Sequence, residues 1–204
     1  MILSTIDIRN AMQSKDITIF PFIEKYLGDS SYDIHLARTL LVMENEKPIK
    51  YDLMSRENSM KYILKPGEFL LGCSLEFVGV PTGRLEGRID GTSSIGREAM
   101  TTHITASKLN PGHSLHLTME IVNLSNKPIE LKFGMPIGQV TFEELKTPID
   151  FDYLKDKLLR SYGGVEFDEN PIPETSKLKI KTAESHAFFL DFFKFTFWFI
   201  YLFI

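Results

Sequence analysis

The stretch Ser114-Leu115-His116-Leu117-Thr118-Met119-Glu120-Ile121 alternates between apolar and polar side chains. Successive side chains of a β-strand point to opposite faces of a sheet, so this pattern predicts a strand with one apolar face. The other face carries His116, Thr118 and Glu120. If that face is open to water, Glu120 is an ordinary surface carboxylate. If it lines a cleft, Glu120 is a candidate general acid or base. The alternation alone leaves both readings open.

Similar short runs, rich in β-forming residues, extend on either side of this stretch. They cover residues 32–42, 69–77, 87–90, 103–106, 115–122, 129–131 and 137–142. Turn sequences with Pro, Gly or Asn separate them at residues 65–67, 81–83, 110–112, 125–128 and 134–136. Ser4 and Asp7 are suited to cap a helix of about ten residues at the N-terminus. The chain is therefore predicted to be mainly β, a barrel or sandwich with a short N-terminal helix and few other helical segments.

The composition limits the classes of function. The chain has 204 residues, 43% hydrophobic and 25% charged, as expected for one globular domain. Its net charge of -4 argues against a nucleic-acid-binding surface, which needs a basic face, but permits binding of a free nucleotide. Cys73 is the only cysteine, which rules out an internal disulfide and a Cys-rich zinc site. With no signal-peptide pattern at the N-terminus, we expect a cytoplasmic protein.

The C-terminal part differs from the rest. We divide the chain into a domain of residues 1–165, a flexible arm of residues 166–186 and a Phe-rich tail of residues 187–204. Residues 163–186 are rich in Gly, Pro, Glu and Lys, which predicts a mobile segment. A membrane-spanning helix needs about 20 apolar residues. The tail has 18 residues, with Asp191 and Lys194 among them. An appendage outside the fold is favoured over a membrane or partner contact.

The segment Asp90-Gly91-Thr92-Ser93-Ser94-Ile95-Gly96-Arg97-Glu98 predicts an anion site. Hydroxyl residues follow a glycine at the end of a strand and precede a helical stretch, where free N–H groups and the helix dipole favour a phosphate. Ser93 and Arg97 are four residues apart, hence on one face of a helix. An ordinary helix cap followed by a surface arginine would have the same sequence.

Taken in order, several segments resemble the dCTP deaminase family of the dCTP deaminase and dUTPase superfamily. The matching residues lie at 1–8, 28–36, 64–69, 91–97, 105–106 with 111–112, Glu120 with Asn123, and 134–139. The resemblance covers about residues 1–165. It implies a distorted β-barrel and a homotrimer whose active sites are shared between subunits. It also implies deamination of dCTP to dUTP and ammonia without zinc, with Mg²⁺ carried by the nucleotide phosphates.

The resemblance also assigns roles to individual residues. Glu120 matches the catalytic glutamate, and Ser93 and Arg97 match residues that position the water and stabilise charge at C4. Ser94 matches a triphosphate contact, and Ala106 lies where backbone groups meet the base. The chain has no His-x-Glu and no Pro-Cys-x-x-Cys sequence, so it lacks the ligands of the zinc deaminases.

Four positions depart from the family pattern. Thr92 replaces an arginine directed at the triphosphate, and His35 replaces another arginine. Asn110 replaces the aspartate before Pro-Gly, and the lid sequence around Tyr162 lacks a lysine and a glutamine. Thr92, Asn110 and Tyr162 nevertheless remain predicted substrate contacts. Because the related dUTPases use an aspartate at the turn to activate water, a diphosphatase or a bifunctional enzyme ranks below a deaminase. A non-catalytic nucleotide-binding regulator is the alternative from another class.

Overall fold

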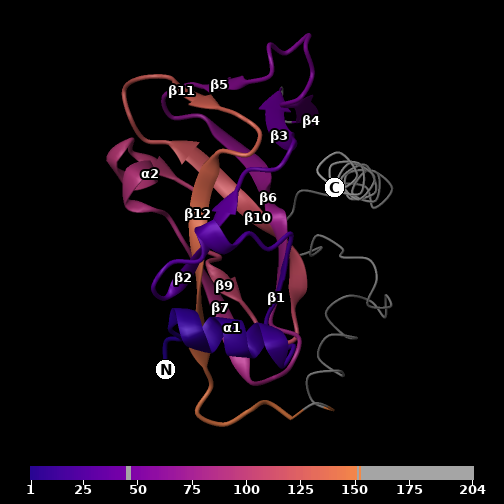
Figure 1. The fold of residues 1–204 in the computed structure, drawn as a ribbon. Coiled ribbons are helices and arrows are strands. Elements are labelled where there is room, and N and C mark those ends of the chain that lie inside the picture. The colour runs from indigo at the N-terminus through magenta and orange to yellow at the C-terminus, as the bar shows by residue number, and fades with distance from the viewer. Residues whose placement is uncertain (45–46, 151, 153–204) are drawn as a thin grey trace. The chain divides into compact units, whose positions relative to one another are not determined.

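Strand β10 (Ser114–Asn123) runs through the largest sheet of the protein, as its alternating sequence predicts. The computed structural model describes residues 1–44, 47–150 and 152, which belong to one compact unit, Met1–Leu154. Figure 1 shows β10 beside β6 in the middle of this unit, with α1 and β9 in the lower half of the view and α2 in the upper half. The lid residue Tyr162, the arm 166–186 and the tail 187–204 lie outside the described residues.

Three sheets make up the described fold, and every described strand pair is antiparallel. The largest has the order β4 (Lys47–Asp52), β3 (Thr39–Glu44), β6 (Phe69–Gly79), β10 and β8 (Met100–Thr101), and β1 (Thr18–Phe20) also pairs with β6. A second sheet has the order β2 (Ser31–His35), β12 (Pro136–Glu144), β7 (Leu85–Asp90) and β9 (Lys108–Leu109). The smallest pairs β11 (Ile129–Leu131) with β5 (Tyr62–Leu64). The helical elements are α1 (Thr5–Gln13), the 3-10 helix η1 (Glu24–Tyr26) and α2 (Ser93–Arg97). The predicted mainly β fold, a distorted barrel with a short N-terminal helix, is confirmed.

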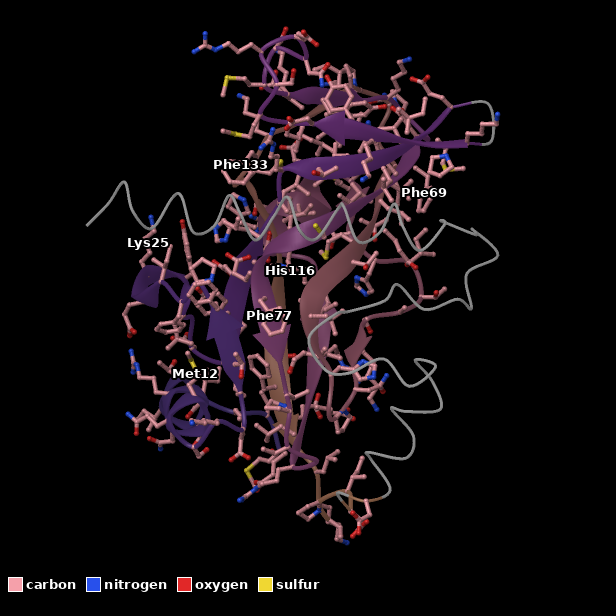
Figure 2. All side chains as sticks on the ribbon, turned by 90° about the vertical axis from the view of Figure 1, so that its right-hand side faces the viewer. Met12, Lys25, Phe69, Phe77, His116 and Phe133 are labelled. Carbon is pink, nitrogen blue, oxygen red and sulfur yellow. The ribbon has the colours of Figure 1, made fainter. Side chains whose placement is uncertain are left out.

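The apolar face of β10 packs into the core. Leu117, Met119 and Ile121 are at most 1% exposed, which confirms the face that the alternation predicts. On the opposite face His116 is also buried, and Phe77 of β6 lies across from it with the ring centroids 5.6 Å apart (Figure 2). Burial lowers the pKa of His116 to about 4, so its imidazole is neutral near pH 7.

Strand β6 makes an excursion opposite β10. His116 pairs with Phe77 and Thr118 with Cys73, so three residues of β6 face the single residue Leu117. Ser74 takes over the broken ladder bond, because its Oγ accepts a hydrogen bond from the Leu117 amide (2.8 Å) and donates one to the Glu76 carbonyl (2.6 Å). Such a bulge sends a side chain in a direction that a regular strand does not permit.

The side chain redirected by this excursion is that of Glu76. Its Oε1 lies 2.7 Å from His35 Nδ1, and its Oε2 accepts a hydrogen bond from the His35 amide at 2.9 Å. The two side chains are only 4% and 2% exposed. Since His35 ends β2 and Glu76 belongs to β6, this buried pair joins the two larger sheets. The residue in place of the family's arginine is therefore part of the core.

Several local predictions can be compared with the described elements. The capped helix is confirmed as α1, with Ser4 and Asp7 forming a reciprocal capping box. The predicted strand 32–42 is two strands, β2 and β3. The prediction of a strand at 103–106 is wrong, and the reason lies in the site described below. The sequence reading missed the short strands β1, β4, β5, β8 and β9. Within the described ranges, no helix is long and apolar enough to cross a membrane.

We predict that Ser74→Ala lowers the free energy of unfolding by about 1–3 kcal/mol, because the buried Leu117 amide loses its acceptor. Urea denaturation followed by circular dichroism measures the change. Ser30→Ala, at an exposed position, serves as the control and should have little effect. Equal stability of the two variants would show that Ser74 does not support the excursion.

Candidate active site

Helix α2 and the loop before it present the hydroxyl residues of the predicted anion site. Thr92 is the N-cap, and its Oγ1 accepts a hydrogen bond from the Ile95 amide at 3.4 Å and lies 2.9 Å from Ser94 Oγ. Ile95 is buried and fixes the helix to the core, while Ser93, Ser94 and Arg97 are exposed. The loop and helix predicted from the sequence are confirmed. They leave the hydroxyl and guanidinium donors open to an anion.

Gln139 of β12 lies at the start of this loop, and the sequence reading assigned it no role of its own. Its Nε2 donates to the Gly91 carbonyl at 3.4 Å, and its Oε1 accepts from Ser31 Oγ at 3.0 Å. The register pairs Gln139 with Asp90, the last residue of β7. In the sequence, the only indication of a role for Gln139 is its place in the family-like run 134–139. The side-chain amide of Gln139 therefore links the anion loop that follows β7 to Ser31 of β2, the strand on the other side of β12.

The Glu120 carboxylate is anchored to backbone. Its Oε2 accepts hydrogen bonds from the amides of Ile104 (2.7 Å) and Thr105 (3.2 Å). In a strand, two successive amides point in opposite directions, so both can reach one oxygen only where the chain bends. This is why residues 103–106 are not a strand. No hydrogen bond from the described residues is seen at the other oxygen, Oε1. Glu120 is half-buried and Ala106, next to Thr105, is exposed.

A short antiparallel connection brings α2 and Glu120 to the same end of β10. The chain leaves α2 through Ala99, whose φ of 53° is in the left-handed region, and enters β8. Met100 and Thr101 then pair with Asn123 and Val122 of β10. The ladder continues with a hydrogen bond from the Glu120 amide to the Thr102 carbonyl at 3.0 Å. Helix α2, which carries Ser93 and Arg97, is thus connected through β8 to the end of β10 nearest Glu120.

Two polar atoms of neighbouring residues, Thr102 Oγ1 and His103 Nδ1, are buried without a hydrogen-bond partner among the described residues. An unpaired buried polar group destabilises the folded state by about 1–3 kcal/mol. The bend at 102–105 is therefore a conformation that other contacts must hold in place. The hydrogen bonds to Glu120 are among those contacts.

The remaining predicted contacts are not part of this cluster. Asn110 lies in the turn after β9, where its carbonyl accepts a hydrogen bond from the His113 amide at 3.0 Å, close to the first residue of β10. Ser114 and Glu120 are six residues apart on the strand, which corresponds to roughly 20 Å. The structure therefore places Asn110 far from Glu120 within one chain. Tyr162 lies outside the described residues.

The comparison with known protein families can now be set beside this geometry. A family model described as dCTP deaminase-like matches residues 2–145. The chain belongs to this dCTP deaminase-like family. As a family member it is a hydrolase of the deaminase class. The matched range contains α2 with Ser93 and Arg97, β8, and β10 with Glu120.

Individual relatives agree with the family assignment. A Corynebacterium jeikeium (strain K411) protein named dCTP deaminase, dUMP-forming, is 35% identical over 191 residues, covering 89% of this chain and 100% of that protein. A Streptomyces avermitilis protein of the same name is 36% identical over 174 residues, covering 80% and 91%. The crystal structure of 2'-deoxycytidine 5'-triphosphate deaminase from Agrobacterium tumefaciens has a TM-score of 0.58 at 15% identity. That match covers 84% of this chain and 55% of the other, and it shows similarity of fold.

Proposed function

We propose that this dCTP deaminase family member hydrolyses the 4-amino group of the cytosine of dCTP, with Glu120 as the general base and acid. The observation that carries the proposal is the anchored carboxylate of Glu120 beside the bend at residues 104–105. One oxygen is held by two backbone amides at 2.7 and 3.2 Å, which orients the other toward a reacting group. A carboxylate fixed in this way needs little reorganisation when it accepts a proton.

In the proposed reaction, Glu120 takes a proton from water as the water oxygen bonds to C4 of the cytosine, and the electron pair of the C4–N3 double bond moves to N3, which receives that proton from Glu120. The resulting tetrahedral intermediate carries both the new hydroxyl group and the amine at C4. Glu120 then moves the hydroxyl proton to the amine, the C4–N4 bond breaks as the C4=O double bond forms, and ammonia leaves with a uracil base remaining. Ser93 and Arg97 orient the water and stabilise the charge that develops near C4.

The anion loop supplies the contacts for the phosphates in this proposal. Thr92, Ser94 and the amides at the start of α2 donate hydrogen bonds to phosphate oxygens, while the exposed Ala106 lies where backbone groups meet the base. We expect Mg²⁺ to enter bound to the triphosphate, since it commonly keeps several waters and phosphate ligands. The hydroxyl and guanidinium groups of this loop suit phosphate oxygens better than they suit a metal ion.

Purified protein supplied with dCTP and Mg²⁺ is expected to release ammonia, and Glu120→Gln should lower kcat by about 10²–10⁴-fold because the glutamine cannot transfer the proton. The glutamine oxygen can still accept the two amide hydrogen bonds, so the fold should persist. Glu144→Gln, at an exposed position ending β12, is the matched control. Nucleotide binding without turnover by the wild type would indicate a regulatory protein instead.

Formation of dUMP is a second candidate activity, and the names of the relatives favour it. Both relatives compared above are named dUMP-forming. Asn110 argues against dUMP formation by this chain. The related dUTPases use an aspartate at this turn to activate water, and the neutral amide of Asn110 cannot take a proton from water. We therefore propose deamination as the main reaction, with dUTP as its product.

Chromatography of the reaction products tests this assignment. We expect dUTP from the wild type, and additional dUMP and pyrophosphate from Asn110→Asp, which restores a carboxylate to the turn. Asn126→Asp adds the same charge at an exposed turn and is the control. If the wild type itself yields dUMP and pyrophosphate, the chain shares the activity named for its relatives and residue 110 does not decide the product.

We also propose a cytoplasmic homotrimer with active sites shared between subunits. The support is the separation of roughly 20 Å along β10 between Glu120 and Ser114, the strand residue next to the turn of Asn110, which a neighbouring subunit would bridge by supplying its own turn. Light scattering coupled to size-exclusion chromatography should give about three times the chain mass of 23.4 kDa. A monomer that retains full deaminase activity would contradict the shared site.

A further inference from the structure

We propose that Thr101 is a positioning residue for Glu120, an inference that rests on the proposed deamination. Thr101 is the last residue of β8, and its Oγ1 donates a hydrogen bond to the His103 carbonyl at 2.7 Å. The next two amides, those of Ile104 and Thr105, are the donors to Glu120 Oε2. The Thr101 hydroxyl therefore fixes the carbonyl of the peptide unit whose amide is that of Ile104.

Hydrogen bonds connect the backbone of residues 101–105 to β10 at two places. Thr101 pairs with Val122 of β10, two residues beyond Glu120. The Thr102 carbonyl accepts the hydrogen bond from the Glu120 amide at 3.0 Å. The backbone of residues 101–105 is thus bound to β10 before the bend through the ladder, and after the bend through the Glu120 carboxylate. Thr101 holds the bend between these two attachments.

The bend needs a stabilising hydrogen bond because two of its buried polar atoms have no partner among the described residues. Thr102 Oγ1 and His103 Nδ1 have no partner in the observed bend, so a conformation that pairs or hydrates them competes with it. The Thr101 hydroxyl favours the observed bend because its hydrogen bond exists only when the His103 carbonyl turns back toward β8. Loss of this hydroxyl leaves Glu120 with weaker orientation while the groups that meet the substrate remain unchanged.

Thr101→Val tests the proposal, because it removes the hydroxyl and retains the branched shape that suits a strand. We expect kcat for ammonia release to fall about tenfold, equivalent to about 1.4 kcal/mol, with KM changed less than about twofold. Thr101→Ser, which keeps the hydroxyl, should restore most of kcat. Thr82→Val is the matched control: Thr82 is also half-buried, and its hydroxyl donates to Asp16 at 2.6 Å. It should alter stability without altering kcat.

A double-mutant cycle distinguishes positioning of Glu120 from a general structural effect. In the Glu120→Gln background, Thr101→Val should change the residual rate by less than about twofold, since the proton-transfer group is already absent. A tenfold fall in both backgrounds would overturn the proposal, as would an unchanged kcat in the single variant or a failure of Thr101→Ser to restore it. If the valine variant does not fold, Thr101→Ala is the second hydroxyl-free variant.

The wild-type assay separates this proposal from the proposed function. Absence of ammonia release by the wild-type full chain would refute the deaminase function itself. Ammonia release by the wild type that is equally fast in Thr101→Val would refute only the role of Thr101. The wild-type sample therefore tests the deaminase function, and the comparison of Thr101→Val with the wild type tests the role of Thr101.

Discussion

The buried pair of Glu76 and His35 is the interaction on which the rest of the described fold depends. Glu76 reaches His35 only because β6 leaves its regular path between Cys73 and Phe77. A buried carboxylate is tolerated when both of its oxygens are satisfied, and here His35 satisfies both with its ring and its amide. The pair fixes the end of β2 to β6, and with it the relation between the two larger sheets.

The excursion of β6 also determines how β10 is held. Ser74 supplies the acceptor that the ladder lacks at Leu117, so the strand passes the irregularity with its backbone satisfied. Beyond this point β10 pairs with β6 on one side and with β8 on the other. Glu120 pairs with Leu71 of β6 and, on the other side, its amide donates to the carbonyl of Thr102, the residue after β8. A carboxylate on a strand paired on both sides is positioned more rigidly than one on a loop.

The residues that match the family's deamination site are all present in this chain, whereas several that match its phosphate contacts are replaced. The pairing of β8 with β10 connects α2, which carries Ser93 and Arg97, to the end of β10 nearest Glu120. The loop carrying Thr92 has hydroxyl groups where the family pattern has an arginine, and the turn carrying Asn110 lies at the other end of β10. The residues that match the family's deamination site are thus present in the sequence, whereas the loop at Thr92 lacks a positive charge of the family pattern.

Local sequence determined much of the architecture. The period-two pattern of 114–121 predicted which face of β10 is buried, and Ser4 with Asp7 predicted the cap of α1, because both depend on neighbours in sequence. The ordered motifs likewise indicated the family, which the match over residues 2–145 confirms, while the roles of Ser93, Arg97 and Glu120 stay predictions.

Tertiary structure alone decided the features that depend on partners distant in sequence. Residues 103–106 look like a strand, but the amides of Ile104 and Thr105 donate to the Glu120 carboxylate, 16 and 15 residues away. His35 stands where the family pattern has an arginine, but its contact with Glu76, 41 residues away, makes it part of the core. Periodicity reports the alternation of side chains along one segment. It carries no information about which distant group will satisfy a given backbone amide, and that choice shapes the site around Glu120.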